Sequence, residues 1–397
     1  MSNNNKTPAI RFKGFTDTWE QRKFSELTEI RSASRVHKEE WQSSGVPFYR
    51  SSDVMAALNG TENEKAFISE ELYEKLSAVS GKLEKGDVLV TGGGSVGKPY
   101  IVPNNEPLYT KDADLLWIKN NENLDPYFVY TFFFSPTFTD YLNSVSHVGT
   151  IAHYTITQLG ETPITLPCVS EQQKIGDYFR NLDSLITLHQ RKCDKLIQFK
   201  AAMLKKIFPP NGADKPEIRF KGFTDAWEQR KVQDVADRFD NLRIPVAANL
   251  RVHGTTPYYG ANGIQDYVEG FTHDGEFVLV AEDGANDLKN YPVKCVNGRI
   301  WVNNHAHVLQ GKAGIADNSF LAFAISQSDI ESLLVGGGRA KLNAEALMSI
   351  EFRLPCLQEQ YRIGEYLTQL DNLITLHQRK CDKYKSIKAG LIRKLFP

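Results

Sequence analysis

The chain contains one long helical segment twice. Residues 182–209 and 370–397 are identical at 18 of 28 aligned positions. In each copy the apolar residues recur at spacings of three and four, which is the pattern of a heptad seam. Neither copy has a proline before its last residue. The longer stretch from about Glu171 to Phe208, which also lacks proline, therefore predicts one unbroken helix of about 55 Å, at 1.5 Å per residue, and the second copy predicts its duplicate. Such a helix has to bury its apolar stripe, and its own duplicate is the natural antiparallel partner.

The predicted seam occupies equivalent positions in the two copies. These residues are Ile175, Phe179, Leu182, Ile186, His189, Cys193 and Leu196 in the first copy, and Ile363, Leu367, Leu370, Ile374, His377 and Cys381 in the second. Antiparallel pairing would bring the two His and two Cys together, in the composition of a tetrahedral zinc site. The same side chains also suit plain packing in a seam. Packing is the simpler interpretation, and no metal ligand is assigned.

A second duplicated box opens each half of the chain. Residues 10–23 read IRFKGFTDTWEQRK, and residues 218–231 differ from them at one position only. Between the halves, residues 209–216 read PPNGADKP, which is the composition of a linker. The chain is thus a tandem duplication.

The segments between box and helix predict two mixed domains. Strand-like runs at 46–50, 88–91, 100–102 and 115–119 precede a helix that Asp125 caps and Pro126 begins. Residues 257–259, 277–280 and 317–325 are their counterparts in the second half. We expect an α+β fold, with two mixed α/β domains separated by two long helices packed as an antiparallel coiled coil. The expected boundaries are 1–169 (box and first domain), 170–209 (first helix, with Ser170 as N-cap), 210–217 (linker), 218–357 (second domain) and 358–397 (second helix).

Charge is unevenly distributed in this chain of net charge −1. Residues 171–208 and 359–396 each carry 8 basic against 4 acidic residues. In contrast, residues 24–167 carry 11 against 19, and residues 232–355 carry 10 against 15. Neutralisation of phosphates supplies most non-specific affinity for DNA. Acidic domains of this kind would therefore need a partner to supply much of the positive field on DNA.

Targeting and cysteine usage are those of a cytoplasmic protein. No run of eighteen apolar residues is present, and the sequence begins MSNNNKTPAI without an apolar stretch. We therefore expect a cytoplasmic location without membrane association. The five cysteines lie far apart, and four of them are repeat equivalents. We expect all five to be reduced.

Two motifs resemble enzyme sites and fail in detail. Residues 92–98 read GGGSVGK after a predicted strand, but Pro99 replaces the Ser or Thr that should bind Mg²⁺ and begin a helix. Residues 125–128 read DPYF, which lacks the second proline of the amino-methyltransferase signature and fits a capped helix. No catalytic residue is assigned.

Candidates for reading nucleic-acid bases are polar or aromatic residues in predicted turns, because Arg, Lys, Asn and Gln match the donors and acceptors of base edges. They are Arg50, Ser52, Ser95, Lys98, His147, Thr150, His153 and Tyr154 in the first domain, and Tyr258, Tyr259, Asn262, Gln265, Lys289, Asn290, Arg339 and Lys341 in the second.

Together these features resemble the specificity subunit of type I restriction-modification enzymes. The residues that carry the resemblance are the WEQRK boxes (19–23 and 227–231), the Leu-Pro-x-x-x-Glu-Gln segments (166–172 and 354–360) and the twin LDxLITLHQRK helices. The resemblance spans essentially the whole chain and implies two target recognition domains, each reading one half of a bipartite, asymmetric DNA site. It also implies a helical spacer, two docked adenine-N6 methyltransferase subunits and translocating nuclease subunits.

In that family the specificity subunit has no catalytic centre. The resemblance implies no cofactor in this chain, with S-adenosylmethionine, ATP and Mg²⁺ bound by the partner subunits. The alternative from a different class is a structural coiled-coil adaptor whose domains bind proteins rather than DNA. Duplication and acidity would both allow it.

Overall fold

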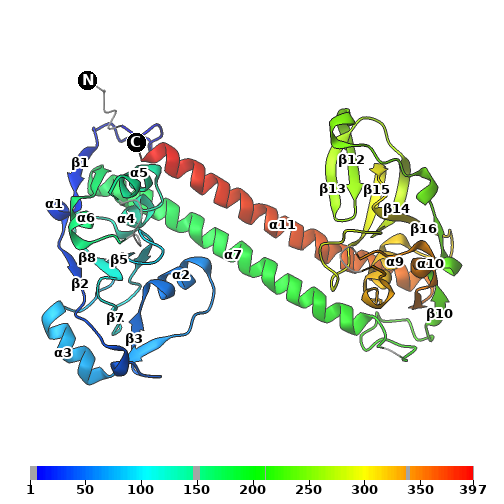
Figure 1. The fold of residues 1–397 in the computed structure, drawn as a ribbon, viewed down its shortest axis with the longest axis horizontal. Coiled ribbons are helices and arrows are strands. Elements are labelled where there is room, and N and C mark those ends of the chain that lie inside the picture. Colours follow the sequence, from blue (N-terminus) through cyan, green and yellow to red (C-terminus); the bar gives the residue numbers. More distant parts are fainter. Residues whose placement is uncertain (1–6, 146–152, 211, 337–339, 397) are drawn as a thin grey trace. The chain divides into compact units, whose positions relative to one another are not determined.

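The structure, a computed structural model, describes residues 7–145, 153–210, 212–336 and 340–396. The chain divides into two compact units (Figure 1). Unit 1 comprises residues up to 189 together with 379–397, and unit 2 comprises residues 190–378. Both boundaries fall within long helices, so each unit contains a domain and parts of both helices.

The two long helices are α7 (Val169–Ile207) and α11 (Leu357–Leu395), each of 39 residues. The first turn of α7 closes on the carbonyl of Cys168, which accepts hydrogen bonds from the backbone N–H groups of Glu171 and Gln172. The prediction of Ser170 as N-cap was therefore wrong. Ser170 already lies within the helix, which begins directly after the Leu-Pro-Cys segment.

Within each unit the beginning of one long helix packs against the end of the other. In unit 1, Lys388 Nζ donates to Asp183 Oδ1 at 2.6 Å, and the Tyr384 ring stacks on His189. In unit 2 the repeat equivalents Lys200 and Asp371 form the same bond at 2.6 Å. Since the paired stretches run in opposite directions, each unit contains an antiparallel two-helix stem.

The stems bury most of the seam. The buried positions are Ile175, Phe179, Leu182, His189, Cys193, Ile363, Leu367, Leu370 and Cys381, and the partly buried ones are Ile186, Leu196, Ile374 and His377. The thiols of Cys193 and Cys381 lie 4.0 Å and 3.9 Å from the carbonyls of Ile374 and Ile186. Both thiols therefore face the backbone of the opposing helix.

The remaining elements form the two domains. Unit 1 contains β1 (Glu20–Lys23), α1 (Phe24–Leu27), β2 (Ile30–Ser32), β3 (Val46–Tyr49), α2 (Ser51–Asn59), β4 (Ala66–Ile68), α3 (Glu70–Ser80), β5 (Val88–Thr91), β6 (Pro99–Ile101), β7 (Tyr109–Thr110), β8 (Leu115–Ile118), α4 (Pro126–Phe132), α5 (Pro136–Val145), α6 (Ile156–Glu161) and β9 (Pro163–Leu166). Unit 2 contains β10 (Glu228–Lys231), α8 (Val232–Val235), β11 (Ala236–Arg238), β12 (His253–Gly260), β13 (Gly263–Val268), β14 (His273–Ala281), β15 (Val293–Val302), β16 (Ala306–Gly311), α9 (Asn318–Ser326), α10 (Ala344–Ser349) and β17 (Glu351–Leu354). The predicted strands and capped helices are confirmed in both domains.

The two domains share one topology. The sheet of unit 2 has the order β11-β16-β14-β15-β12-β13, and unit 1 has the sheets β2-β8-β5-β6 and β4-β3-β7. Strand β15 pairs antiparallel with β14 and parallel with β12, and β6 and β7 make the corresponding pairs with β5 and β3. Together, β6 and β7 therefore take the place of β15. Pro103 and Pro107 lie between them, and proline cannot donate a ladder hydrogen bond.

The duplicated boxes connect each domain to its stem. Strand β1 pairs with β9 and β10 with β17, just before each long helix. The box residue Trp19 is buried with its ring centroid 6.4 Å from that of Phe396, and Trp227 lies 6.1 Å from Phe208. Each box tryptophan thus packs against the end of a long helix, which explains why box and helix are duplicated together.

A buried ion pair fixes each box to the first turn of a long helix. Arg11 Nε and Nη2 donate to the two carboxylate oxygens of Glu171 at 2.9 and 2.6 Å, and Arg219 makes the same two bonds to Glu359 at 2.7 Å. Both glutamates are fully buried. A buried charge that loses its partner costs about 3–5 kcal/mol.

The adjacent glutamine and a glycine hold the domain helix. Gln360 Oε1 accepts from the Asp317 backbone N–H at 2.9 Å, and the Asp317 carboxylate caps α9 by accepting from Phe320 N at 2.8 Å. Burial raises the pKa of Asp317. A Cβ at Gly364, one turn along α11, would lie only 2.6 Å from Asp317 Oδ1. The Glu-Gln-x-x-x-Gly pattern thus encodes close packing of stem on domain, and Gln172, Asp125 and Gly176 repeat it in unit 1.

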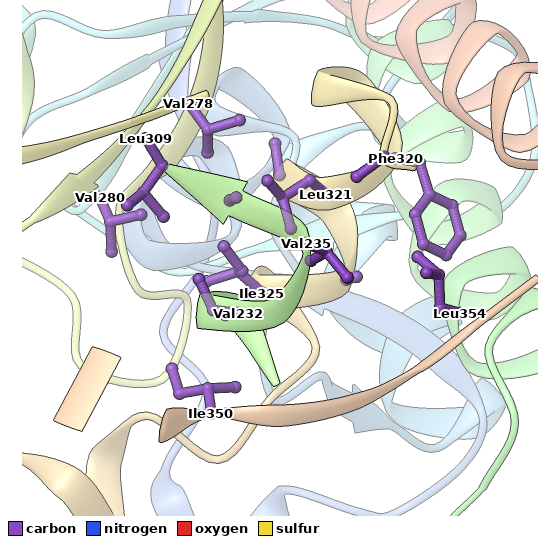
Figure 2. Packing of buried hydrophobic residues seen from close by; sticks show 14 of the residues in the cluster. Val232, Val235, Val278, Val280, Leu309, Phe320, Leu321, Ile325, Ile350 and Leu354 are labelled. Atoms are coloured by element: carbon purple, nitrogen blue, oxygen red, sulfur yellow. The ribbon is translucent and has the colours of Figure 1, made fainter. Parts of the chain in front are cut away.

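The core of unit 2 lies between the sheet, α9 and the box (Figure 2). Val278, Val280 and Leu309 face it from β14 and β16, and Phe320, Leu321 and Ile325 come from α9. Val232 and Val235 of α8, together with Ile350 and Leu354, close the side toward the box. Because box and domain share this core, the stem is anchored by apolar packing as well as by the ion pair. No helix in the described part of the chain is long and apolar enough to cross a membrane.

Two glycines of α11 provide a matched test of this packing. We expect Gly364→Ala to lower the free energy of unfolding of unit 2 by about 1–3 kcal/mol, because overpacking outweighs the gain in helix propensity. Gly390, on the same helix, has no described atom within 4 Å of its ideal Cβ. Gly390→Ala should therefore be neutral or stabilising by up to about 1 kcal/mol. Urea denaturation with hydrogen exchange of each unit measures both effects. Equal stability of the two variants would contradict the packing argument.

Candidate nucleic-acid interface

The same backbone hydrogen bonds bring four segments together in each domain. In unit 1, Gly92 N donates to Asp114 O at 2.7 Å, Tyr154 N to Gly92 O at 2.7 Å, and Lys111 N to Tyr49 O at 2.9 Å. In unit 2 the equivalent bonds run from Glu282 N to His305 O at 2.9 Å, from Leu342 N to Glu282 O at 2.7 Å, and from Asn303 N to Tyr259 O at 3.1 Å. We call the surface made by these segments the strand-end edge. It comprises residues 50–53, 92–98, 111–114 and 153–155 in unit 1, and residues 260–265, 282–292, 303–305 and 340–343 in unit 2.

The edge of unit 1 depends on glycine for its close packing. A Cβ at Gly93 would lie 3.2 Å from Asp114 Oδ1 and 3.6 Å from the His153 ring. Lys111 Nζ donates to the Asp114 carboxylate at 2.6 Å. Asp114, Lys111 and His153 therefore lie around one glycine, and they offer a carboxylate, an ammonium and an imidazole side by side.

The glycine loop itself is a closed turn. The Thr91 hydroxyl accepts from Lys98 N at 2.8 Å and donates to the Ser95 carbonyl. Gly94 and Gly97 adopt φ values of +69° and +76°, which favour glycine. Strand β6 follows directly at Pro99. A phosphate-binding loop would lead into a helix instead, so this geometry does not support nucleotide binding.

The edge of unit 2 is built from amides and a longer loop. Asn262, in the β12–β13 turn, donates to Gly284 O at 2.9 Å and accepts from Asn286 N at 2.9 Å. The buried Asn303 donates to Gln265 Oε1 at 3.4 Å, and His305 contacts the Asp283 carboxylate at 2.5 Å. The bonds of Asn262 tie the hairpin turn to the loop, whereas Gln265 is an exposed residue whose amide oxygen is held by Asn303.

A buried ionic network supports this edge in unit 2. Glu282 accepts from Arg243 Nη1 at 2.6 Å and lies 2.9 Å from Lys341 Nζ. His307, almost fully buried, contacts Asp240 Oδ2 at 2.7 Å through Nδ1 and the Leu342 carbonyl at 2.9 Å through Nε2. The network therefore fixes residues 341 and 342, which form one side of the edge.

The network has the spacing of a metal site, although its charges are already balanced. The ligand atoms of Asp240, Glu282 and His307 lie within 4.8 Å of one another. Burial raises the pKa of Glu282, but hydrogen bonds from Arg243 and Lys341 outweigh burial and hold the pKa below its usual range. Arg243 and Lys341 thus already neutralise the carboxylates of Asp240 and Glu282.

Most of the predicted base-reading residues lie at the strand-end edges. Arg50, Ser52, Ser95, Lys98 and His153 do so in unit 1, and Asn262, Gln265, Lys289, Asn290 and Lys341 in unit 2. Arg50 is held by Asp53, by the Glu64 carbonyl and by the Trp41 ring. His147, Thr150 and Arg339 lie outside the described residues.

Three predicted aromatic residues are buried instead. Tyr154 is 1% exposed, with its hydroxyl bonded to Thr162, and Tyr258 is 1% exposed, with its hydroxyl accepting from Val246 N at 2.9 Å. Tyr259 is 7% exposed. A buried ring cannot reach a base without local unfolding, so these three residues act as supports of the edge.

The sequence reasoning missed several residues of the edge. They are Lys111 and Asp114 in unit 1, and Asp283, Asn286, Asn303 and His305 in unit 2. The offset of 188 residues that aligns Tyr154 with Leu342 makes the predicted residues His153 and Lys341 equivalent. The missed residues follow only from strand pairing.

Comparisons with known proteins agree with this architecture. The family model described as the type I restriction modification DNA specificity domain matches residues 16–198 and 224–385. A protein of Haemophilus influenzae named as a type I restriction enzyme specificity subunit is 44% identical over 146 residues, which are 37% of this chain and 38% of that protein.

Two further similarities cover different shares of the chain. The MjaVIII specificity subunit of Methanocaldococcus jannaschii is 20% identical over 58% of this chain and 60% of that protein. The crystal structure of a type I restriction-modification system S subunit from M. genitalium matches 98% of this chain and 99% of that chain, with a TM-score of 0.64 and 15% identity. At this identity the structural match supports the fold.

The pH dependence of Glu282→Gln tests the network. The low pKa of Glu282 stabilises the folded state above the pKa of the unfolded carboxyl, about 4.3. That contribution is lost as the pH falls through the still lower pKa of the folded state. We expect Glu282→Gln to destabilise unit 2 by about 1.5–3 kcal/mol at pH 7, and the difference to shrink below about pH 4.

Chemical denaturation across this pH range measures the difference. The exposed Glu269→Gln should change stability little at any pH. A Glu282→Gln effect that stayed constant down to pH 3 would argue against an ionised, paired carboxylate.

Proposed function

The chain belongs to the type I restriction-modification DNA specificity family, and on this premise we propose that it is the non-catalytic DNA-recognition subunit of such a complex. In this proposal each domain reads one half of a bipartite, asymmetric site through its strand-end edge. The observation that supports it most directly is the shared backbone frame: the same three hydrogen bonds in both units present unrelated side chains. Two domains that recognise different DNA sequences need the same backbone arrangement with different side chains on it.

The chemistry of the edges suits base reading. Amides such as Gln265 and cations such as Lys341 match the donor and acceptor patterns of base edges in the major groove. Lys98 and Lys289 are suited to phosphates, which fix the register of a protein on DNA without reading sequence. The exposed Gly94, which has no described atom within 4 Å of its ideal Cβ, leaves room for the backbone to approach the duplex.

In this proposal the two long helices set the distance between the half-sites. Each helix has 39 residues, or about 58 Å at 1.5 Å per residue. Readers on one face of B-DNA need a separation of about one helical turn, ~34 Å, or a multiple of it. Helices of this length can hold two readers at that distance.

The duplicated helices also offer two equivalent docking sites for methyltransferase subunits. Leu188 and Leu376 are repeat equivalents, each 45% exposed, and Leu373 is 43% exposed. Apolar side chains that gather in one exposed patch mark protein-binding surfaces, and we propose that these leucines belong to such patches. We assign the binding of S-adenosylmethionine, ATP and Mg²⁺ to the methyltransferase and translocase subunits, and a complex that acts on DNA belongs in the cytoplasm.

The acidic domains make DNA binding depend on these partners. Basic residues are outnumbered by acidic ones in both domains, so phosphate neutralisation by this chain alone is limited. The methyltransferase subunits supply the missing positive field as they close around the duplex. If the chain were the alternative, a coiled-coil adaptor whose domains bind only proteins, the assembled complex would show no preference for any DNA sequence.

Gln265→Ala tests base reading by unit 2. Removing the exposed amide should relax the preference at one base pair of one half-site, at a cost of about 1–3 kcal/mol, and leave the other half-site unchanged. Gln233→Ala is the matched control, because Gln233 is exposed in α8, away from the edge. Methylation of a DNA library with randomised half-sites, by the assembled complex, measures both. Loss of preference in both halves, or in neither, would contradict the assignment.

A heptad insertion tests the spacer. Seven residues added to each long helix, at the 189/190 and 378/379 boundaries, keep the seam in register and lengthen it by about 10 Å. The unread gap should widen by about three base pairs, at 3.4 Å per pair. An unchanged gap in an active complex would refute the spacer role.

A further inference from the structure

Unit 2 carries an exposed apolar face that unit 1 lacks. Among the described residues, eleven large apolar side chains are exposed in 218–356, against two in 7–168, and seven of the eleven fall within 242–271. Four of these seven belong to the two segments next to Trp301, residues 244–252 and 269–272: Ile244 (51% exposed), Leu250 (69%), Val252 (62%) and Phe271 (46%). We call this surface the Trp301 face.

The Trp301 face is a single ordered surface. Trp301 stacks on the buried Tyr258, and its Nε1 donates to the Ile244 carbonyl at 2.7 Å. The Val252 carbonyl accepts from Glu269 N at 2.9 Å, and a Cβ at Gly270, beside Phe271, would lie 3.3 Å from the Trp301 ring. The backbone at Ile244 and at Gly270 therefore contacts the Trp301 ring, the bond to Glu269 ties Val252 to the second segment, and Leu250 lies two residues before Val252.

In the domain of unit 1, helix α3 lies at the position that corresponds to the Trp301 face. Strand pairing makes Tyr109 the counterpart of Trp301, because Tyr109 pairs with Phe48 as Trp301 pairs with Tyr258. In unit 1, Tyr73 of α3 packs edge-on against Tyr109 at 6.2 Å, and Ser80 contacts the Tyr109 hydroxyl at 3.1 Å. Leu72 and Leu76 of α3 pack against the same core. Helix α3 therefore buries Tyr109 in unit 1, whereas its counterpart Trp301 is only partly buried in unit 2.

The connection between β13 and β14 does not supply this helix in unit 2. Between β4 and β5 of unit 1 there are nineteen residues, 69–87, which include α3, whereas β13 and β14 of unit 2 are joined by residues 269–272. The α3 helix of a second copy is already buried on its own domain through Tyr73 and Ser77. Both observations favour a different protein as the source of the occupant.

We propose that the Trp301 face binds an amphipathic helix of the methyltransferase subunit, in the position that α3 occupies in unit 1. The assignment of the partner rests on the proposed function above. Helix-in-groove recognition uses apolar anchors at i, i+3, i+4 and i+7. The occupant presents aliphatic and aromatic side chains at this spacing, as Leu72, Tyr73 and Leu76 do in α3. The complex is then asymmetric, with an additional methyltransferase contact on unit 2 only.

The double variant Leu250→Asp/Val252→Asp of the full-length chain tests the proposal. Both side chains point to solvent, so the fold should persist, and thermal unfolding checks this. Titration of the methyltransferase subunit by calorimetry should show one of its two binding events weakened at least tenfold and the other unchanged. Val79→Asp is the matched control, because Val79 is 82% exposed on α3 of unit 1 and outside the face. It should leave both events unchanged.

Hydrogen exchange of the wild-type complex gives a second readout. Backbone amides of 244–252 and 269–272 should gain protection when the methyltransferase subunit binds, and those of α3 should not. Unchanged affinity of the double variant, or no added protection, would overturn the Trp301 face while leaving the proposed function intact. Self-association of the chain that the double variant abolishes would overturn it in favour of a second copy. If wild-type chain bound no methyltransferase subunit, both proposals would fail.

Discussion

The buried ion pair at the start of each long helix is the constraint on which the architecture depends. Glu171 and Glu359 are fully buried and each accepts two hydrogen bonds from a box arginine. Removing either partner would leave an uncompensated buried charge. The neighbouring glutamine fixes the cap of a domain helix, and the glycine four residues later allows that helix to approach. Box, stem and domain are therefore joined at one place, which lets the rest of the domain surface diverge.

The difference between the duplicated junction of box, stem and domain and the diverged domain surfaces explains what could be predicted from the sequence. The repeated helices, the boxes and the Asp-capped helices follow from periodicity and cap chemistry, and they were predicted correctly. Ser170 was placed at the helix start because it is a common N-cap residue. The helix instead begins one residue before it, on the carbonyl of Cys168. Cap preference is a weak signal where the preceding segment already fixes the chain direction.

The strand-end edges could be predicted only in part. Several of the Lys, Asn and Gln candidates lie in segments of the edge, and their role in base reading stays a prediction. Tyr154 and Tyr258 were also candidates for base reading, yet both rings are in the core. Asp114 and His305 reach the edge through strand pairing across long sequence separations, which periodicity does not encode. The replacement of β15 by β6 and β7, and the presence of α3 in one domain alone, likewise follow from tertiary structure.

The proposed division of labour has a simple physical basis: rigid stems for spacing, variable edges for reading, and partners for charge and catalysis. Its most direct test is a genome-wide map of N6-methyladenine in cells that express this chain with its methyltransferase subunit, compared with cells that express the methyltransferase subunit alone. We predict one new split motif, with two short defined halves around a fixed unread gap. Absence of any such motif, although the two subunits co-purify, would contradict DNA recognition and leave the chain as an assembly platform.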